Sequence, residues 1–295
     1  MGIIEKEGLI LSGKNGRYTV ECDSVQYVCR SGTRVRKNDG KILAGDRVIF
    51  RENDGNEGFI TSMLPRKNAL VRPPVANIDV LAIVVAPKDP LPYLYNIDLL
   101  SVITQKNNIE CVIIVSKSDL GDCDDLIETY RKTPFKVVLT SSETGLGIDE
   151  ARNLLSGKIC VLCGASGVGK STLLNALYPN LNLETGALSQ KIARGKNTTR
   201  TTELFPLGNN TYLADTPGFT AVNTELYCAI EHDELKDLFP EFSEYESNCR
   251  YSDCTHTKET ECGIAEAVQS GAIAASRHES YIKLYGELKS IDRYK

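Results

Sequence analysis

The sequence has 295 residues, of which 41% are hydrophobic and 25% are charged, and its net charge is −5. This length fits two or three domains, and the composition excludes an intrinsically disordered chain. The sequence has no apolar run near the roughly 20 residues that cross a bilayer and no signal peptide, so we expect a cytoplasmic protein without a membrane partner. The ten cysteines then favour reduced thiols and one metal site over a disulfide scaffold.

The charge is unevenly distributed along the chain. Residues 1–67 carry 12 Lys+Arg against 9 Asp+Glu, whereas residues 223–295 carry 8 against 15. Any contact with a phosphate backbone is therefore expected near the N-terminus. A basic face that is merely solvated is the alternative interpretation.

The first segment, residues 1–67, alternates in polarity as half-buried strands do. The strand-like stretches are 17–22, 25–30, 46–51 and 58–60, and turn formers separate them at 13–16, 38–40 and 53–55. About five short strands without a helix signal predict a small β-barrel, of which the OB-fold is the commonest reader of nucleic acid. The pattern alone does not separate an OB-fold from an SH3-like barrel.

Continuous apolar runs replace the alternation in the second segment, residues 68–222. The runs are 80–86, 111–115, 137–139 and 159–163, with helical stretches such as 94–107 and 124–132 between them. They predict an α/β domain with a largely parallel sheet. The third segment, residues 223–295, has acidic helical stretches and a final amphipathic helix over about 264–294, which predict a helical domain.

A phosphate-binding loop follows the run at 159–163. The sequence Gly164-Ala165-Ser166-Gly167-Val168-Gly169-Lys170-Ser171 matches G-x-x-x-x-G-K-[ST], and a helix follows from Thr172. Backbone N–H groups of residues 164–172 are expected to bind the phosphates of a nucleotide. Lys170 is expected to reach the β- and γ-phosphates, and the Ser171 hydroxyl to coordinate Mg²⁺.

Two further polar loops fit the switch elements of a GTPase. Asp215-Thr216-Pro217-Gly218 follows a strand, so Asp215 is expected to hold Mg²⁺ through water and the Gly218 amide to sense the γ-phosphate. Between this motif and the phosphate loop, Thr198 or Thr199 is expected to supply a hydroxyl to Mg²⁺. An ordinary strand start is the alternative interpretation of these threonines.

Guanine-reading elements precede the phosphate loop instead of following it. Ser116-Lys117-Ser118-Asp119 ends one buried run, and Asp119 is expected to accept two hydrogen bonds from guanine while Lys117 lays its stem over the base. Ser141 and Ser142, after the next run, are expected to form the supporting base loop. The order of motifs is therefore a circular permutation of the standard GTPase order, which is tolerated where new ends fall in exposed loops.

A cysteine and histidine cluster lies in the third segment. Its members are Cys249, Cys254, His256 and Cys262, a Cys₃His set of four tetrahedral ligands. Because no coordination position is left open, we expect one structural zinc ion per chain. The other cysteines mostly fall in apolar runs, and Cys160 and Cys163, although spaced as C-x-x-C, are interpreted as core residues because they face opposite sides of a strand.

Taken together, the permuted order, the phosphate loop, Asp215-Thr216-Pro217-Gly218 and the C-x4-C-x-H-x5-C cluster resemble the RsgA (YjeQ) family of small-ribosomal-subunit biogenesis GTPases over essentially the whole chain. The resemblance implies an OB-fold, a permuted GTPase domain and a zinc-bearing helical domain. It also implies binding to the 30S subunit and its 16S rRNA late in assembly, with ribosome-stimulated hydrolysis of GTP to GDP. We expect a monomer.

The sequence departs from the family pattern at the nucleotide site. Ser116 stands where the family has Asn, so we expect guanine to bind through Asp119 with lower affinity. Asn197 stands where the family has a His, and Phe219 follows the Asp-x-x-Gly motif where a Gln would position water. We therefore expect slow intrinsic turnover that a partner accelerates.

Two other functions fit parts of the sequence. A P-loop kinase would need an arginine-rich lid and an adenine pocket, and neither is evident. A nucleotide-dependent RNA-binding protein with little hydrolysis would be compatible with the changes at Ser116 and Asn197. GTP turnover in the presence of ribosomal subunits separates this second alternative from the main prediction.

Overall fold

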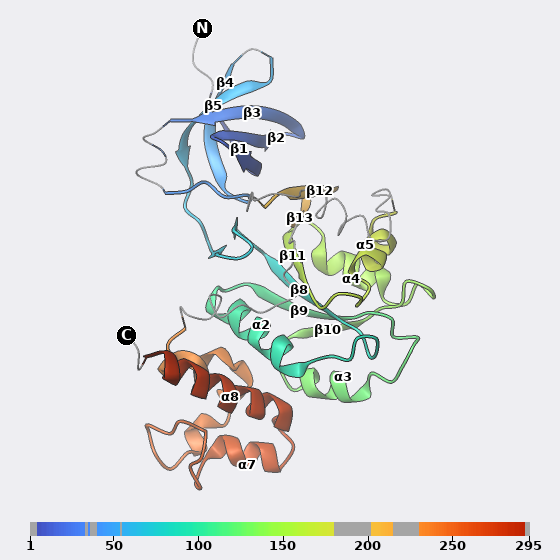
Figure 1. Ribbon diagram of the computed structural model, residues 1–295, viewed down its shortest axis with the longest axis vertical. Coiled ribbons are helices and arrows are strands. Elements are labelled where there is room, and N and C mark those ends of the chain that lie inside the picture. Colours follow the sequence, from blue (N-terminus) through green and yellow to red (C-terminus); the bar gives the residue numbers. More distant parts are fainter. Residues whose placement is uncertain are drawn as a thin grey trace. The chain divides into compact units, whose positions relative to one another are not determined.

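The structure is a computed structural model that describes residues 5–32, 35, 40–53, 55–179, 202–214 and 230–292 (Figure 1). The chain divides into two compact units. One comprises residues 1–80, 153–162 and 180–219, and the other comprises residues 81–152, 163–179 and 220–295. Among the described residues, no helix is both long enough and apolar enough to cross a membrane.

A closed five-stranded barrel forms the N-terminal part of the chain (Figure 1). Its strands are β1 (Glu5–Lys14), β2 (Arg17–Cys22), β3 (Val25–Ser31), β4 (Arg47–Asn53) and β5 (Glu57–Met63), and their order is β1-β2-β3-β5-β4. Inward side chains at alternating positions, among them Val20, Cys29 and Phe50, fill the barrel core. The expected OB-type barrel is therefore confirmed, with β1 as a strand that alternation alone did not reveal.

The second sheet has six strands in the order β10-β9-β8-β11-β13-β12. Their bounds are β8 (Val80–Val85), β9 (Glu110–Val115), β10 (Lys136–Leu139), β11 (Ile159–Cys163), β12 (Leu204–Gly208) and β13 (Thr211–Ala214). The pairs β9–β10 and β11–β13 are parallel, and β12–β13 is antiparallel. Every residue of β8 and of β11 is buried, as the continuous apolar runs predicted.

Helices connect the strands of this sheet. They are α2 (Leu94–Lys106), α3 (Asp124–Arg131), α4 (Ile148–Leu155) and α5 (Lys170–Leu177), and the short strands β6 (Ala69–Leu70) and β7 (Val75–Ala76) pair before the sheet begins. Alternating strands and helices in this order form an α/β domain. The C-x-x-C cysteines Cys160 and Cys163 are both buried in β11, which confirms their interpretation as core residues.

The C-terminal region is helical but differs from the single long helix that we expected. It contains the 3₁₀ helices η3 (His232–Leu238), η4 (Pro240–Phe242) and η5 (Glu246–Asn248), followed by α7 (Gly263–Gln269) and α8 (Ala275–Asp292). The predicted helix breaks at Gly271, which has a φ of +76° that only glycine adopts readily. Residues at helical spacing, Arg277, Tyr281, Leu284 and Leu288, form the buried face of α8.

A buried ion cluster joins α8 to α2 within this unit. Arg277 is fully buried and donates through Nη1 to Asp98 of α2 at 2.9 Å and through Nε to Glu241 of η4 at 2.7 Å. Tyr130 of α3 donates its hydroxyl to the same Asp98 oxygen at 2.8 Å. Burial alone would lower the pKa of Arg277, but the two carboxylates more than offset that effect, so the guanidinium stays charged.

Candidate nucleotide site and metal cluster

The phosphate loop connects β11 to the N-terminus of α5. Gly164 has a φ of +147°, and a Cβ at this position would collide with the carbonyl of Val84. Gly169 has a φ of +90° and is the N-cap of α5, with no side chain that caps the first N–H groups of the helix. The loop therefore presents free backbone donors at a helix N-terminus, which is the arrangement that binds phosphate.

Lys170 lies over the backbone of this loop. Its ammonium donates to the carbonyl oxygens of Gly164 and Ala165, both at 2.7 Å. Burial lowers the pKa of Lys170. Ser171 and Thr172 follow in the first turn of α5, half-buried and exposed respectively. In the loop itself, Ala165, Ser166 and Gly167 are exposed, whereas Val168 is buried.

The base motif reaches the phosphate loop through Ser116. The Ser116 hydroxyl is buried after β9, and its oxygen lies 2.5 Å from the carbonyl oxygen of Val168 and 2.9 Å from that of Val85. A hydroxyl has one proton, so it donates to one of these carbonyls at a time. Although Ser is shorter than the Asn of the family pattern, it still links the end of β9 to the phosphate loop.

Lys117 makes a second link between the same two loops. Its ammonium donates to the carbonyl of Gly167 at 2.7 Å and to that of Asp89 at 3.1 Å. Its φ of +53° lies in the left-handed region, which is uncommon for a residue with a side chain. The Lys117 side chain runs beside Gly169, where an added Cβ would lie 3.5 Å from Lys117 Cε.

The next two residues of the motif differ in their exposure. Asp119 is exposed. The Ser118 hydroxyl is buried and has no hydrogen-bond partner among the described residues. The Ser118 backbone N–H donates to the carbonyl of Thr140 at 3.1 Å, which ties this motif to the loop after β10. The exposed Asp119 carboxylate fits the two donor groups of a guanine edge.

The loop after β10 is a compact turn closed by its own hydrogen bonds. Ser141 is buried, and its hydroxyl oxygen accepts from the Thr144 N–H at 3.2 Å, while its own N–H donates to Leu146 O at 3.0 Å. Gly147, with a φ of +65°, packs against the Leu139 carbonyl. This geometry leaves Ser142 exposed. The structure therefore brings the two base loops and the phosphate loop together, as the permuted order predicted.

Sequence reasoning missed several contributors to this site because they are backbone carbonyls. The oxygens of Val85, Asp89 and Val168 accept the bonds that join the loops, and a carbonyl leaves no residue-specific signal in a sequence. The switch residues Thr198, Thr199, Asp215 and Gly218, with Asn197 and Phe219, lie outside the described residues. Their assignments stay predictions.

The four cysteine and histidine side chains converge as expected. The ligand atoms of Cys249, Cys254, His256 and Cys262 all lie within 4.8 Å of one another. The thiols of Cys249 and Cys262 are 4.0 Å apart, and each lies 3.5 Å from His256 Nδ1. Around a tetrahedral zinc ion, two thiolates would be about 3.8 Å apart and a thiolate and an imidazole nitrogen about 3.5 Å apart. The cluster therefore has the dimensions of a metal site.

The surrounding loop holds these ligands in place. Burial lowers the pKa of His256, which keeps the imidazole neutral and able to coordinate. The Cys249 sulfur accepts from the Gly263 N–H at 3.3 Å. The Glu259 carboxylate accepts hydrogen bonds from the N–H groups of Thr255, Thr257 and Lys258, which fixes the turn that contains His256.

Comparison with known proteins agrees with this architecture. The protein-family model of the RsgA N-terminal domain matches residues 7–60, and the family model of the RsgA GTPase matches residues 63–225. A protein named small ribosomal subunit biogenesis GTPase RsgA from Thermotoga neapolitana is 41% identical over 293 residues, which cover 97% of this chain and 98% of that protein. Its namesake from Carboxydothermus hydrogenoformans is also 41% identical, over 97% of this chain and 99% of that protein.

Two solved structures are similar along almost the whole chain. The crystal structure of YjeQ from Thermotoga maritima has a TM-score of 0.82 and 38% identity, covering 97% of this chain and 99% of that chain. The structure of YloQ, described as a circularly permuted GTPase, has a TM-score of 0.78 and 28% identity, covering 97% and 96%. The permuted arrangement inferred from the motif order is thereby confirmed.

Proposed function

The chain belongs to the RsgA family of GTPases and is a GTP hydrolase, and from that premise we propose that it acts in biogenesis of the small ribosomal subunit. In this role it binds the 30S subunit and its 16S rRNA late in assembly, and the subunit stimulates hydrolysis of GTP to GDP. It works as a cytoplasmic monomer. The domains run over 1–67, 68–222 and 223–295.

One observation carries the nucleotide assignment. Ser116 and Lys117, from the base motif, reach the Val168 and Gly167 carbonyls of the phosphate loop. Elements that are about 50 residues apart and in permuted order thus form one site, as a single nucleotide with a base and a triphosphate requires. Asp119 supports guanine over adenine, because a carboxylate pairs with the two donors of guanine and finds no such pair on adenine.

The residues have distinct roles in this proposal. Backbone N–H groups of residues 164–172 and the Lys170 ammonium hold the phosphates, and the flexible lysine head exchanges its two carbonyl acceptors for phosphate oxygens. Ser171, Thr198 or Thr199, and Asp215 through water would hold Mg²⁺, and Gly218 would sense the γ-phosphate. Magnesium, when bound, neutralises charge on the β- and γ-phosphate oxygens.

The Cys₃His cluster is proposed to hold a structural zinc ion. Its three sulfurs and one imidazole nitrogen fit zinc in ligand type and in spacing. All four positions of a tetrahedron are filled by protein, so the ion supplies folding free energy to the loop between η5 and α7 and takes no part in hydrolysis.

The test of the function is GTP hydrolysis by the pure protein with and without 30S subunits, with Lys170→Ala as the control. We expect slow turnover alone and strong stimulation by 30S subunits that Lys170→Ala abolishes. Stimulation by 50S subunits to the same level would contradict the choice of partner. Absence of turnover in every condition would favour a nucleotide-dependent RNA-binding protein and remove the proposed ribosome-stimulated reaction.

A further inference from the structure

One ring nitrogen of the Cys₃His cluster is buried without a partner. His256 is 3% exposed, and its Nε2 has no hydrogen-bond partner among the described residues. The other ring nitrogen, Nδ1, lies 3.5 Å from the sulfur of Cys249 and 3.5 Å from that of Cys262. The imidazole therefore turns Nδ1 toward the other ligands of the cluster and Nε2 away from them.

This orientation decides where the proton of the imidazole lies. A neutral imidazole has one N–H, and a nitrogen that coordinates a metal ion cannot carry it. If Nδ1 is the ligand, the proton is on Nε2 of His256. A buried N–H without an acceptor is destabilising, and native structures nearly always provide one.

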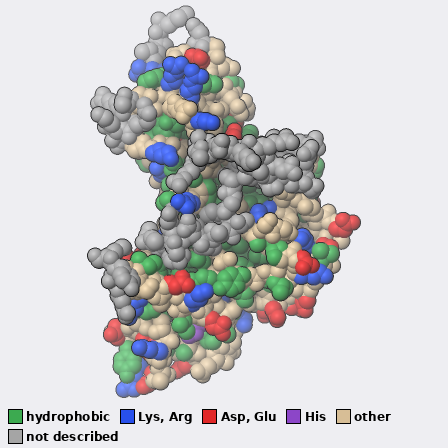
Figure 2. Space-filling model, in the orientation of Figure 1, with side chains coloured by type: hydrophobic (Ala, Val, Ile, Leu, Met, Phe, Trp, Pro, Cys, Tyr) green, Lys and Arg blue, Asp and Glu red, His purple; other side chains and the backbone are tan. Residues whose placement is uncertain are grey.

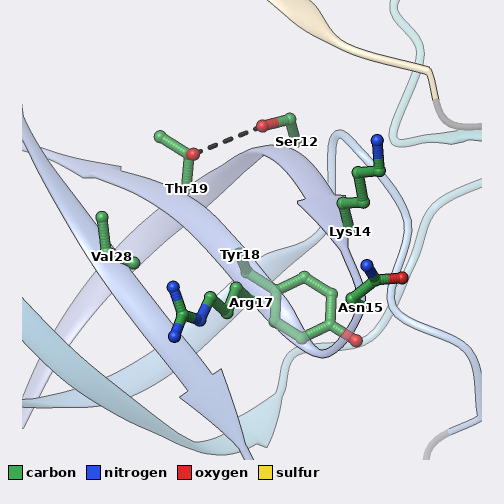
Figure 3. Close-up of a pocket in the computed structure, with 7 residues that line it drawn as sticks. All are labelled: Ser12, Lys14, Asn15, Arg17, Tyr18, Thr19 and Val28. Carbon is green, nitrogen blue, oxygen red and sulfur yellow. Dashed lines mark hydrogen bonds between the residues drawn. The ribbon is translucent and has the colours of Figure 1, made fainter.

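Polar groups at the surface do not pose this problem, because water reaches them. In the open hollow over β1, β2 and β3, the side chains of Lys14, Asn15 and Arg17 are exposed (Figure 3). Acidic and basic side chains are likewise interspersed over the surface of the C-terminal part, at the bottom of the view in Figure 2. The Nε2–H group of His256, in contrast, needs an acceptor that the protein supplies.

Glu246 of η5 places a carboxylate beside this nitrogen. Its Oε1 lies 4.0 Å from His256 Nε2, and its side chain is 29% exposed. Glu246 also precedes the ligand Cys249 by three residues, and its backbone carbonyl accepts from the Cys249 N–H at 3.1 Å. One residue thus lies against two ligands of the cluster, through its backbone at Cys249 and through its side chain at His256.

The imidazole is held in this orientation by its surroundings. The ring of Phe242 packs edge-on at 6.1 Å between centroids, and the ring of Tyr281 lies at 6.3 Å. The His256 carbonyl oxygen accepts from Nε2 of His278 on α8 at 2.7 Å. The Glu246 side chain is less constrained than the imidazole, so its rotation would bring the carboxylate to the hydrogen-bond distance of about 2.7–3.2 Å.

We propose that His256 coordinates the metal ion through Nδ1 and donates its Nε2–H to the Glu246 carboxylate, which makes Glu246 a positioning residue of the metal site. This inference rests on the proposed zinc ion and adds a residue beyond its four ligands. A carboxylate that accepts from a ligating imidazole fixes its tautomer and makes the imidazole a stronger ligand. Because Glu246 is partly exposed, its second oxygen stays hydrated, and its charge is not buried beside three thiolates.

Zinc affinity is the first measurement, made on the full-length protein by competition with a chromophoric chelator. Glu246→Ala should weaken zinc binding about 10–100-fold, the usual effect of removing such a partner. Glu246→Gln should lose less, because its amide oxygen can still accept the hydrogen bond. Glu244→Ala, at an exposed glutamate two residues earlier, is the matched control and should leave the affinity unchanged. Each zinc-loaded variant is first checked for an unchanged circular dichroism spectrum.

Nuclear magnetic resonance separates positioning from a general loss of structure. The chain has three histidines, so ¹⁵N-histidine labelling of the zinc-loaded protein gives a simple spectrum. Long-range ¹H–¹⁵N correlations identify which nitrogen of His256 is metal-bound and which is protonated. We expect metal-bound Nδ1 and a protonated Nε2 whose hydrogen exchanges slowly with water. In zinc-loaded Glu246→Ala, this hydrogen should exchange faster while Nδ1 stays bound.

Two results would overturn the proposal. One is a metal-bound Nε2 in the wild-type protein, and the other is wild-type zinc affinity and Nε2–H exchange in both Glu246→Ala and Glu246→Gln. The outcome is separable from that of the proposed zinc ion. Wild-type protein that binds no zinc removes the ion and this inference together. Wild-type protein that binds zinc, with Glu246 variants that bind it equally well, removes the inference alone.

Discussion

The Ser116 hydroxyl oxygen, 2.5 Å from the Val168 carbonyl oxygen, shows how much of the nucleotide site depends on single residues. The base motif of the family has Asn, with its longer amide side chain, at the position of Ser116. Ser is sufficient for the contact with the phosphate loop, since its hydroxyl oxygen already lies within hydrogen-bond distance of the Val168 carbonyl. Ser116 therefore still braces the phosphate loop. The expected loss of guanine affinity would come only from contacts that a longer Asn side chain makes with the base.

Removing this hydroxyl tests its importance. Ser116→Ala leaves the buried Val168 carbonyl without the hydroxyl donor, and such a loss costs about 1–3 kcal/mol. We expect a lower melting temperature and weaker GTP binding, measured by thermal denaturation and by a fluorescent GTP analogue. Ser142→Ala, at an exposed serine of the other base loop, should change stability little. GTP affinity equal to that of wild type would show that Ser116 does not position the phosphate loop.

Asp119 is the residue expected to choose the base. In Asp119→Asn, one of the two acceptor oxygens becomes an N–H₂ group that faces a guanine donor. We expect GTP affinity to fall at least ten-fold, because a hydrogen bond to a charged group contributes about 1.5–3 kcal/mol. Binding of fluorescent GTP and ATP analogues measures the preference. The matched control is Asp125→Asn on the exposed surface of α3. Unaltered discrimination in Asp119→Asn would place guanine recognition elsewhere.

At the scale of secondary-structure elements, periodicity predicted the sheet strands well and failed where glycine or buried charge decides the structure. β1 was missed because its run Leu9-Ile10-Leu11 does not alternate and Gly8, packed on Val20, weakens the pattern. The C-terminal break was missed because an isolated glycine in a helical pattern can be tolerated inside the helix. Arg277 gave no signal, since an arginine on an amphipathic helix is normally exposed.

The buried Arg277 cluster makes the packing of α8 on α2 sensitive to charge. Arg277→Met would leave Asp98 and Glu241 buried without their cation, and breaking a buried pair costs about 3–5 kcal/mol. Chemical denaturation should show this loss. Adding Asp98→Asn and Glu241→Gln should recover part of it, because the buried charges are then removed together. Arg131→Met is the exposed control, and a triple variant no more stable than Arg277→Met would refute a charge origin.

The Cys₃His cluster is a second element whose stability is testable. Cys254→Ser replaces one sulfur ligand, so we expect the purified protein to lose its zinc, measured by elemental mass spectrometry. The loop from 249 to 262 should then become sensitive to protease. Cys22→Ser, a thiol in β2 outside the cluster, should keep one zinc ion per chain. Full zinc occupancy in Cys254→Ser would require a different ligand set.

For the whole molecule, the charge distribution distinguishes the N-terminal barrel from the C-terminal segment as a possible RNA contact. The acidic balance of residues 223–295 opposes contact with RNA, whereas the basic barrel favours it. The sequence could predict both features, since counts and motif order need no coordinates. It could not predict which barrel residues lie opposite one another on neighbouring strands, because the strand register depends on the turn at Asn15 and Gly16 and on the bulge in β1.

If the subunit stimulates hydrolysis by favouring one nucleotide state, binding of nucleotide and of subunit must be coupled reciprocally. We expect the protein with a non-hydrolysable GTP analogue to bind 30S subunits about 5–150-fold more tightly than the GDP form. Subunits must then raise the affinity for the analogue relative to GDP by the same factor. Co-sedimentation measures the first ratio, and nucleotide displacement measures the second. Because hydrolysis releases the protein only if these affinities differ, equal subunit binding in both states would exclude GTP hydrolysis as the release step.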